Sequence, residues 1–177
     1  MQAHEQNCCL RKEEHAEVAQ QALKVAVIGS FRQHYDAVLS AIETFRAAGW
    51  SVTSPDGSSV LDPAVEFVRF DTDEPDWTDA EIQSITLERI FSADLTYVIA
   101  PSGYVGRTTC YEIGRLIQSG RPIYFSEKPE DLPIRVPDRF VATPEQLVGN
   151  SGARMTLESI HAMDDDLSSR TERGLIR

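Results

Sequence analysis

The sequence has few basic residues for its length. Its 177 residues include 17 Lys and Arg against 28 Asp and Glu, so the formal net charge at pH 7 is −11. This balance argues against binding of DNA or RNA, because neutralising the phosphates of a polymer requires a basic face. A single small nucleotide remains a reasonable ligand, since two or three local Arg residues are enough to hold one inside an acidic protein.

Long hydrophobic runs are also absent. No apolar stretch approaches the roughly 20 residues that a membrane-spanning helix needs. Residues 1–15 contain no continuous apolar segment of the kind found in secretory signals. Apolar residues still make up 41% of the chain, which is enough for one buried core. We therefore expect a cytoplasmic protein that has no membrane partner.

Cysteine and histidine are scarce and scattered. The three cysteines, Cys8, Cys9 and Cys110, form no CxxC pair, so they fit neither a disulfide framework nor a structural zinc site. The four histidines form no HExxH motif, and we expect no metal site. GxGxxG, Walker A and GxSxG motifs are missing too, which removes the usual dinucleotide, NTP and serine-hydrolase fingerprints.

Strand and helix patterns alternate through the middle of the chain. Short β-branched or apolar runs predict strands at 24–29, 50–53, 95–100 and 122–125. Between them, helices are predicted at 36–48, from about Thr78, and from a cap at Thr108 or Thr109 to Gln118. This alternation predicts an α/β fold of a single domain: a Rossmann-like or flavodoxin-like parallel sheet with helices on both faces.

Composition divides the chain into three parts. Residues 1–23 are predicted to be a polar leader, 24–148 the α/β domain, and 149–177 a polar tail with a marginal helix. The stretch before the second predicted helix is less regular. It contains a candidate short strand at 65–70 and an acidic loop at 71–76.

Ligands of open α/β sheets bind at the carboxyl ends of the strands, near the point where the strand order reverses. The loop that follows the first strand there is Gly29-Ser-Phe-Arg32. Its glycine, hydroxyl, aromatic ring and guanidinium suit a phosphate that carries a base or a ribose. An ordinary strand-to-helix turn with an exposed Arg accounts for the same four residues, so the local sequence leaves both interpretations open.

A second loop, from Pro101 to Thr109, occupies the equivalent place after the third strand and opens a helix, whose amino end attracts anions. Glu112 falls about one turn into that helix. Either it points back toward the strand ends, or it is a first-turn Glu stabilised by the helix dipole. Gly114 favours the first, because a helical glycine costs about 1 kcal/mol relative to Ala and a tight approach to a neighbouring element would justify it.

Asp94 immediately precedes the third strand and, with Glu112, frames the loop that contains Tyr104. Two carboxylates at one cleft suit cleavage of a glycosidic bond, with one as nucleophile and the other handling protons. An Asp that caps its own turn at the start of a strand is the simpler interpretation of Asp94 taken alone.

These motifs together resemble the nucleoside 2-deoxyribosyltransferase superfamily, whose branch of deoxynucleoside 5′-monophosphate N-glycosidases has similar motifs in the same order. The matching segments are Gly29-Ser-Phe-Arg32, Ser92-Ala-Asp94, Tyr111-Glu-Ile-Gly-Arg115 and Gly120-Arg-Pro-Ile123. The resemblance spans residues 24–127 and implies a Rossmann-like fold that cleaves the N-glycosidic bond of deoxynucleosides or their monophosphates. It also implies a homodimer or larger homo-oligomer.

The resemblance implies specific roles. Glu112 is expected to attack the anomeric carbon, and Asp94, helped by Tyr104, to protonate the departing base. Ser30 and Arg32 would lie near the 5′ end of the substrate. The residues expected to bind substrate are Gly29, Ser30, Phe31, Arg32, Ser102, Gly103, Gly106 and Thr108. Such a reaction needs no metal or redox cofactor.

The loop after the third strand departs from the family pattern. Many transferases place an Asp six residues before the nucleophile and the monophosphate branch often has Ser, whereas this chain has Gly106. Ser102 or Thr108 is a possible source of the missing hydroxyl. The departure motivates one alternative, a nucleotide-binding module without turnover. An NAD-type glycohydrolase is another, because a related fold and a similar glutamate serve that chemistry elsewhere.

Overall fold

The computed structural model describes residues 22–55, 74, 76–150 and 157. Most of the predicted leader (1–23) and tail (149–177) lies outside the described residues. The candidate strand at 65–70 and all of the acidic loop at 71–76 except Glu74 and Asp76 also lie outside them.

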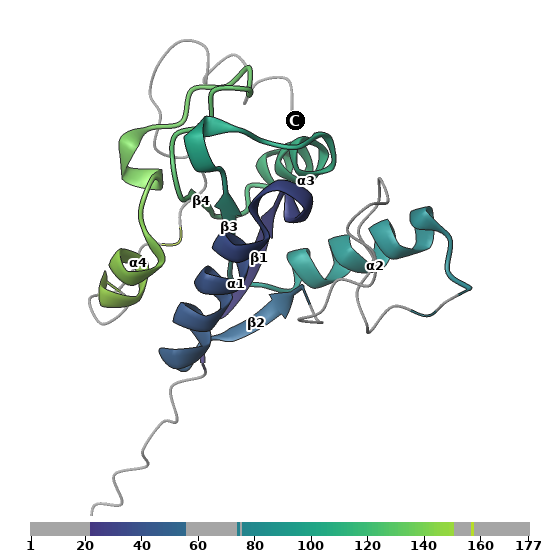
Figure 1. The fold of residues 1–177 in the computed structure, drawn as a ribbon, viewed down its shortest axis with the longest axis horizontal. Helices are drawn as coiled ribbons and strands as arrows, with labels where there is room; N and C mark the ends of the chain where they lie inside the picture. Colours follow the sequence, from purple (N-terminus) through teal and green to yellow (C-terminus); the bar gives the residue numbers. More distant parts are fainter. Residues whose placement is uncertain (1–21, 56–73, 75, 151–156, 158–177) are drawn as a thin grey trace, which may run out of the picture.

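A four-stranded parallel sheet forms the centre of the molecule (Figure 1). Its strands are β1 (Lys24–Gly29), β2 (Ser51–Ser54), β3 (Leu95–Ile99) and β4 (Ile123–Phe125), in the order β2-β1-β3-β4. The four predicted strands are confirmed to within one residue at each end. Residues of β3 and β4 are buried throughout, as expected for strands with helices on both faces.

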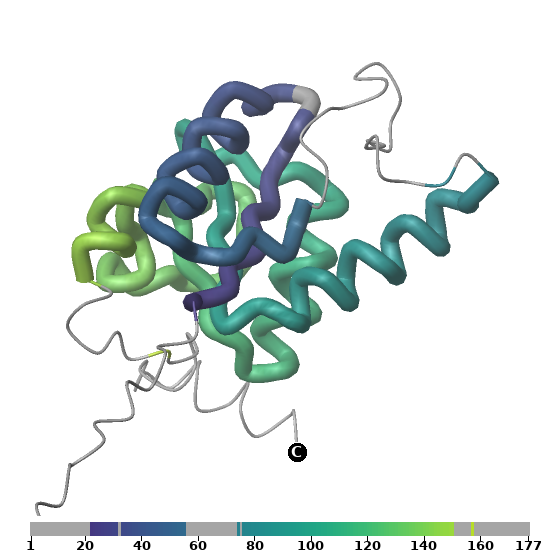
Figure 2. The backbone as a smooth tube through the Cα atoms, turned by 90° about the horizontal axis from the view of Figure 1, so that it is seen from below, coloured from purple at the N-terminus to yellow at the C-terminus, as the bar shows by residue number. Residues whose placement is uncertain are grey.

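Helices cover both faces of the sheet (Figure 2). On one face lie α1 (Phe31–Ala47) and α4 (Pro144–Asn150), and on the other lie α2 (Asp79–Phe91) and α3 (Arg107–Gln118). Right-handed crossovers explain this division. The chain steps from β1 to β2 in one direction, and then returns across the sheet to β3 and β4 in the other. The predicted α/β fold with helices on both faces is therefore confirmed.

Two helix starts differ from the prediction. Helix α1 begins at Phe31, five residues before the predicted start, because Phe31 packs against the core and extends the apolar stripe of the helix. Helix α3 begins at Arg107 after Gly106, so the predicted capping by Thr108 or Thr109 is wrong. Thr109 is instead buried within the first turn.

The start of α2 agrees with the prediction at Thr78. The Thr78 hydroxyl accepts a hydrogen bond from the Glu81 amide at 3.3 Å, and the Glu81 carboxylate accepts one from the Thr78 amide at 2.8 Å. This reciprocal capping box satisfies two backbone donors at the helix end. The hydrogen bonds that the Glu81 carboxylate accepts from the Thr78 amide and from the Thr78 hydroxyl lower the pKa of this exposed carboxyl. The first turn of α2 is thereby fixed.

One hydrophobic core joins the sheet to its helices. On the α1 face, Phe45 stacks on Trp50 with ring centroids 5.1 Å apart and meets Tyr97 of β3 edge to face at 5.3 Å. Such aromatic pairs contribute about 0.5–1.5 kcal/mol beyond the area that they bury. Within the described residues, no helix has the length and apolarity that crossing a membrane requires.

Candidate active site

A cavity of about 410 Å³ opens at the carboxyl end of β1. From this edge α1 departs toward one face of the sheet, while α3 leaves the neighbouring β3 toward the other. The cavity therefore lies at the switch point, where open α/β sheets bind ligands. Its volume falls in the range of small-molecule sites.

Most of the predicted site residues meet in this cavity. Its walls include Gly29, Ser30, Phe31, Tyr104, Gly106, Thr108 and Glu112. They come from segments that are about 70 residues apart in sequence, the β1–α1 loop and the β3–α3 loop. The fold brings these two loops together because β1 and β3 are adjacent parallel strands.

Glu112 is the most deeply buried titratable group of this wall. It is the sixth residue of α3, and only 5% of it is exposed. Burial raises the pKa of Glu112 to about 7, because the ionised carboxylate loses its hydration. A hydrogen bond from Gln83 Nε2 to Glu112 Oε1, at 3.3 Å, lowers the pKa and partly opposes that effect. Glu112 is therefore no ordinary solvated first-turn glutamate.

Asp94 does not share the cleft with Glu112. It precedes β3 at the amino end of the sheet, where its Oδ2 accepts a hydrogen bond of 2.8 Å from the backbone amide of Lys24. Three residues of β1 separate Lys24 from Val27, where the wall of the cavity begins, which is about 10 Å at 3.3 Å per residue. The expected pairing of Asp94 with Glu112 is therefore wrong. Asp94 links the start of β3 to the start of β1.

Ser102 and Gly103, predicted to bind substrate, do not line the cavity. They form the short 3-10 turn Pro101–Gly103, which is hydrogen-bonded to the segment 127–131 that follows β4. Ser102 N–H donates to the Glu127 carboxylate at 3.0 Å, and Glu130 N–H donates to the Gly103 carbonyl at 2.9 Å. These residues support the cavity loop and do not contact the space inside it.

The same segment after β4 also anchors the cavity side of the loop. Val105 N–H donates to the Asp131 carboxylate at 3.3 Å. Val105 lies between Tyr104 and Gly106, which both line the cavity. Acidic residues from a distant part of the sequence therefore fix the position of this wall.

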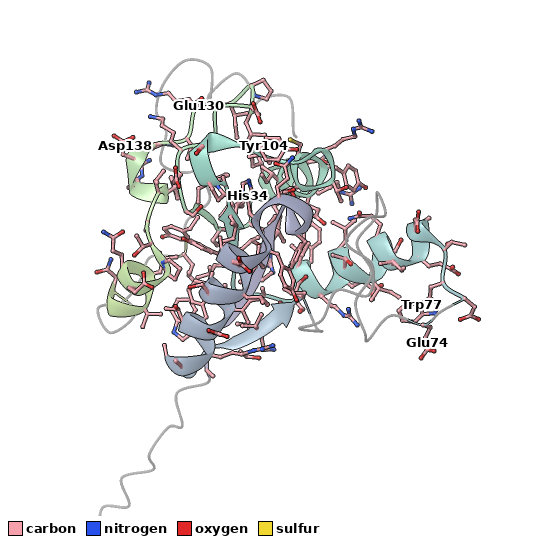
Figure 3. The ribbon with its side chains drawn as sticks, viewed as in Figure 1. His34, Glu74, Trp77, Tyr104, Glu130 and Asp138 are labelled. Atoms are coloured by element: carbon pink, nitrogen blue, oxygen red, sulfur yellow. The ribbon has the colours of Figure 1, made fainter. Side chains whose placement is uncertain are left out.

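Two residues near the start of α1 need separate description. Arg32 is the second residue of the helix, and its side chain lies outside the described part of the structure. His34, which the sequence places just after the first loop, is a half-buried residue of α1. Its ring contacts Tyr104, and the two side chains lie next to each other in Figure 3.

The glycines of the motifs serve different purposes. A Cβ at Gly29 would lie 2.9 Å from both Cβ and the carbonyl oxygen of Ile99, so glycine permits the close approach of β1 to β3. A Cβ at Gly106 would meet only Ser30, at an ordinary 3.7 Å. Gly114 is exposed, and no atom lies within 4 Å of an added Cβ. The expected tight approach at Gly114 is therefore wrong.

The structure adds cavity residues that the motifs did not reveal. One side of α2 contributes polar side chains at three-residue spacing, and the end of β2 adds a short wall: these residues are Gln83, Thr86, Arg89, Ser54 and Pro55. The spacing along α2 and the position at a strand end were visible in the sequence. Which face of α2 turns toward Glu112 depends on the packing of α2 against β1 and β2.

Two helices begin at the cavity wall. Ser30 precedes α1 and Gly106 precedes α3, and neither of these two residues makes a side-chain capping hydrogen bond to its helix. The positive end of the α3 dipole and the first turn of α1, which precedes the break in helical geometry at His34, therefore face the same space, which favours a negatively charged ligand group there. Among the described residues, no three His, Cys, Asp or Glu side chains gather as a metal site would require.

Comparison with known proteins gives no match: no family model, curated protein or solved structure is significantly similar to this chain.

Proposed function

We propose that the protein cleaves the N-glycosidic bond of a nucleoside or nucleotide, with Glu112 as the nucleophile. The observation that carries this proposal is a single buried carboxyl in a cavity at the switch point, beside the amino ends of two helices. Its pKa of about 7 leaves much of Glu112 ionised at neutral pH, as a nucleophile requires. The resemblance of the loop motifs to the nucleoside 2-deoxyribosyltransferases supports the same chemistry.

In the proposed first step, a carboxylate oxygen of Glu112 attacks C1′ of the sugar. A C–O bond forms as the C1′–N bond breaks, and the base leaves with the electron pair of that bond. In the second step, water or another base attacks C1′ and loses a proton to solvent. The C1′–O bond to Glu112 breaks, and Glu112 is released as carboxylate. The base takes up a proton on leaving.

Tyr104 is the proposed source of that proton, since Asp94 lies at the other end of the sheet. Tyr104 lines the cavity from the loop between β3 and α3. Proton donation by a positioned side chain typically contributes 10²- to 10⁴-fold to a rate. Solvent then restores the proton to Tyr104 between turnovers.

The 5′ end of the substrate is assigned to the amino ends of α1 and α3, where the Ser30 hydroxyl lies. A 5′-phosphate there would gain from the dipole of α3 and from the backbone N–H groups in the first turn of each helix. The base is assigned to the side of the cavity formed by Phe31 and Tyr104, whose rings offer stacking surfaces.

We expect a homo-oligomer, which light scattering would test.

A panel of ribo- and deoxyribonucleosides and their 5′-monophosphates tests the proposal, with chromatographic detection of free base. We expect the wild type to release base from at least one member and Glu112→Gln to lose that activity. Glu88→Gln is the matched control, because Glu88 is an exposed glutamate of α2 outside the cavity. Base release that survives in Glu112→Gln would refute the assignment.

A second candidate function is nucleotide binding without turnover. It is favoured by one observation: among the described residues, Glu112 is the only carboxylate that lines the cavity. Glycosidases that use a carboxylate nucleophile usually carry a second carboxyl about 5–5.5 Å away. This candidate predicts that a nucleotide raises the melting temperature of the wild type while no base is ever released from it.

A further inference from the structure

Gln83 contacts Glu112 at the wall of the cavity. It belongs to the second turn of α2, whereas Glu112 belongs to α3, and the 3.3 Å hydrogen bond from Nε2 to Oε1 joins the two helices. We propose that Gln83 is a positioning residue that holds Oε1 of the Glu112 carboxylate and leaves Oε2 to attack the sugar. This inference rests on the proposed function.

A buried carboxylate needs a donor to keep a fixed orientation. When ionised it only accepts hydrogen bonds, and its side chain rotates about three torsions. Among the described residues, Gln83 supplies the one hydrogen bond to the Glu112 carboxyl. Without that bond, the carboxylate would sample several rotamers, few of which aim an oxygen at C1′. Alignment of the reacting atoms is a large part of enzymatic rate enhancement.

The chemical nature of Gln83 suits this role. A Lys or Arg in its place would hold the carboxylate by its charge and lower its nucleophilicity. An amide donates a hydrogen bond without a net charge, so Glu112 stays ionisable but keeps a pKa near neutrality. Gln83 lowers that pKa only enough to oppose part of the effect of burial.

The local sequence fixes where Gln83 points. The Thr78–Glu81 capping box sets the first turn of α2, two residues before Gln83. Gln83 is followed at three-residue intervals by Thr86 and Arg89, and all three side chains line the cavity. The side of the helix that contains Gln83 is therefore directed at the site along its length.

Gln83→Met tests the role, because methionine has nearly the same shape and no donor. In the wild type and the variant, the ionisation of Glu112 is followed by carbon-13 NMR of labelled glutamate carboxyls, with Glu112→Gln used to assign the signal. The pH dependence of base release is measured in parallel. Ser84→Ala is the control, since Ser84 is exposed on the next position of α2 and its hydroxyl donates a hydrogen bond of 2.9 Å to the Ala80 carbonyl of the same helix.

In Gln83→Met we expect the Glu112 titration and the acidic limb of kcat/KM to move upward together by about one pH unit. At pH 7 this is a loss of about fivefold in kcat/KM from ionisation alone. Misorientation adds a further loss in kcat at high pH, where Glu112 is ionised in both proteins, with KM unchanged. If Gln83→Met does not fold, Gln83→Glu replaces it. The added carboxyl also raises the pKa of Glu112, so the same upward shift is expected.

The outcomes separate the two proposals. An unchanged Glu112 titration and an unchanged kcat at high pH in Gln83→Met overturn the role of Gln83, while base release by the wild type still supports the proposed function. Absence of base release from the wild type refutes the proposed function and, with it, the role of Gln83 in attack. A shifted titration would then identify only a hydrogen bond between the two helices.

Discussion

The imidazole of His34 packs edge-on against the ring of Tyr104, with centroids 6.0 Å apart and an interplanar angle of 64° (Figure 3). This contact links α1 to the loop that carries one wall of the cavity. His34 Nε2 is buried and makes no hydrogen bond within the described chain, so the imidazole acts here as a packing surface. The backbone of α1 departs from helical geometry at His34, at φ −131° and ψ 34°.

Tyr104 has two proposed roles: its ring packs against His34, and its hydroxyl donates a proton to the base. Two substitutions separate these roles. Tyr104→Phe retains the ring and its packing but removes the phenolic proton, so we expect nucleotide affinity to be unchanged and base release to slow by about a hundredfold. Tyr104→Ala is expected to lose both. Tyr111→Phe on the exposed side of α3 is the control. Base release by Tyr104→Phe at the wild-type rate would assign the proton to another donor.

The pH dependence of the reaction reports the role of Glu112. A nucleophile must be ionised, and burial raises the pKa of Glu112 to about 7. We therefore expect kcat/KM to rise with pH up to about 7 and to level off above it, measured with a nucleoside so that no phosphate titrates. A rate that instead falls above pH 7 would mean that Glu112 works as the proton donor.

The free energy of unfolding should also depend on the ionisation of Glu112. Because the folded-state pKa of Glu112 lies above the ordinary value of 4.5, the folded protein binds this proton more tightly than the unfolded chain does. The resulting stabilisation is complete below pH 4.5 and is lost as the pH rises through 7. Relative to Glu112→Gln, the wild type should lose about 2–3 kcal/mol of unfolding free energy between pH 5 and pH 8. Urea titrations of both proteins at pH 5 and pH 8 measure the free energy of unfolding. The same difference between wild type and Glu112→Gln at both pH values would contradict the prediction.

Two glycines should respond in opposite directions to alanine. Gly103 has φ +76°, and an added Cβ would lie 2.6 Å from Glu130 Cγ and 3.0 Å from the Lys128 carbonyl oxygen. Gly103→Ala should cost about 1–3 kcal/mol and loosen the cavity loop. Gly114→Ala, in open space on α3, should stabilise by about 1 kcal/mol. Thermal unfolding of both variants provides the comparison, and a loss of stability in Gly114→Ala would contradict the prediction.

Gly106→Ser tests the phosphate end of the cavity. Gly106 has φ −68°, which any residue adopts, and a Cβ there would meet Ser30 at an ordinary distance. The new hydroxyl would stand beside that of Ser30, and we expect it to bind 5′-monophosphates about tenfold more tightly and leave nucleosides unaffected. Gly106→Ala supplies the same Cβ without the hydroxyl. Equal monophosphate affinity in the two variants would show that the phosphate lies elsewhere.

Local pattern was a good guide to the elements. The apolar runs predicted β1, β3 and β4, since a strand buried on both faces must be almost wholly apolar. The partly exposed strand β2 was predicted from its β-branched residues. Local pattern was less reliable at helix starts. Helix α1 begins at Phe31, within the segment Gly29-Ser-Phe-Arg32 that was predicted to be a loop. The pairing of Asp94 with Glu112 failed for a different reason. Sequence order placed both near one loop, but they flank a strand from opposite ends.

The sequence by itself determined that this chain forms an α/β sheet, and that Glu112 follows the loop at the carboxyl end of β3. Hydrophobic periodicity and the chirality of crossovers are local properties, and they suffice for both results. Only the tertiary structure decided which groups share the cavity. Burial of Glu112 and its contact with Gln83 of α2 depend on how helices pack against the sheet, which is set by contacts between residues far apart in the chain. Asp94 is excluded by its place at the amino end of β3, where it accepts a hydrogen bond from Lys24 at the start of β1.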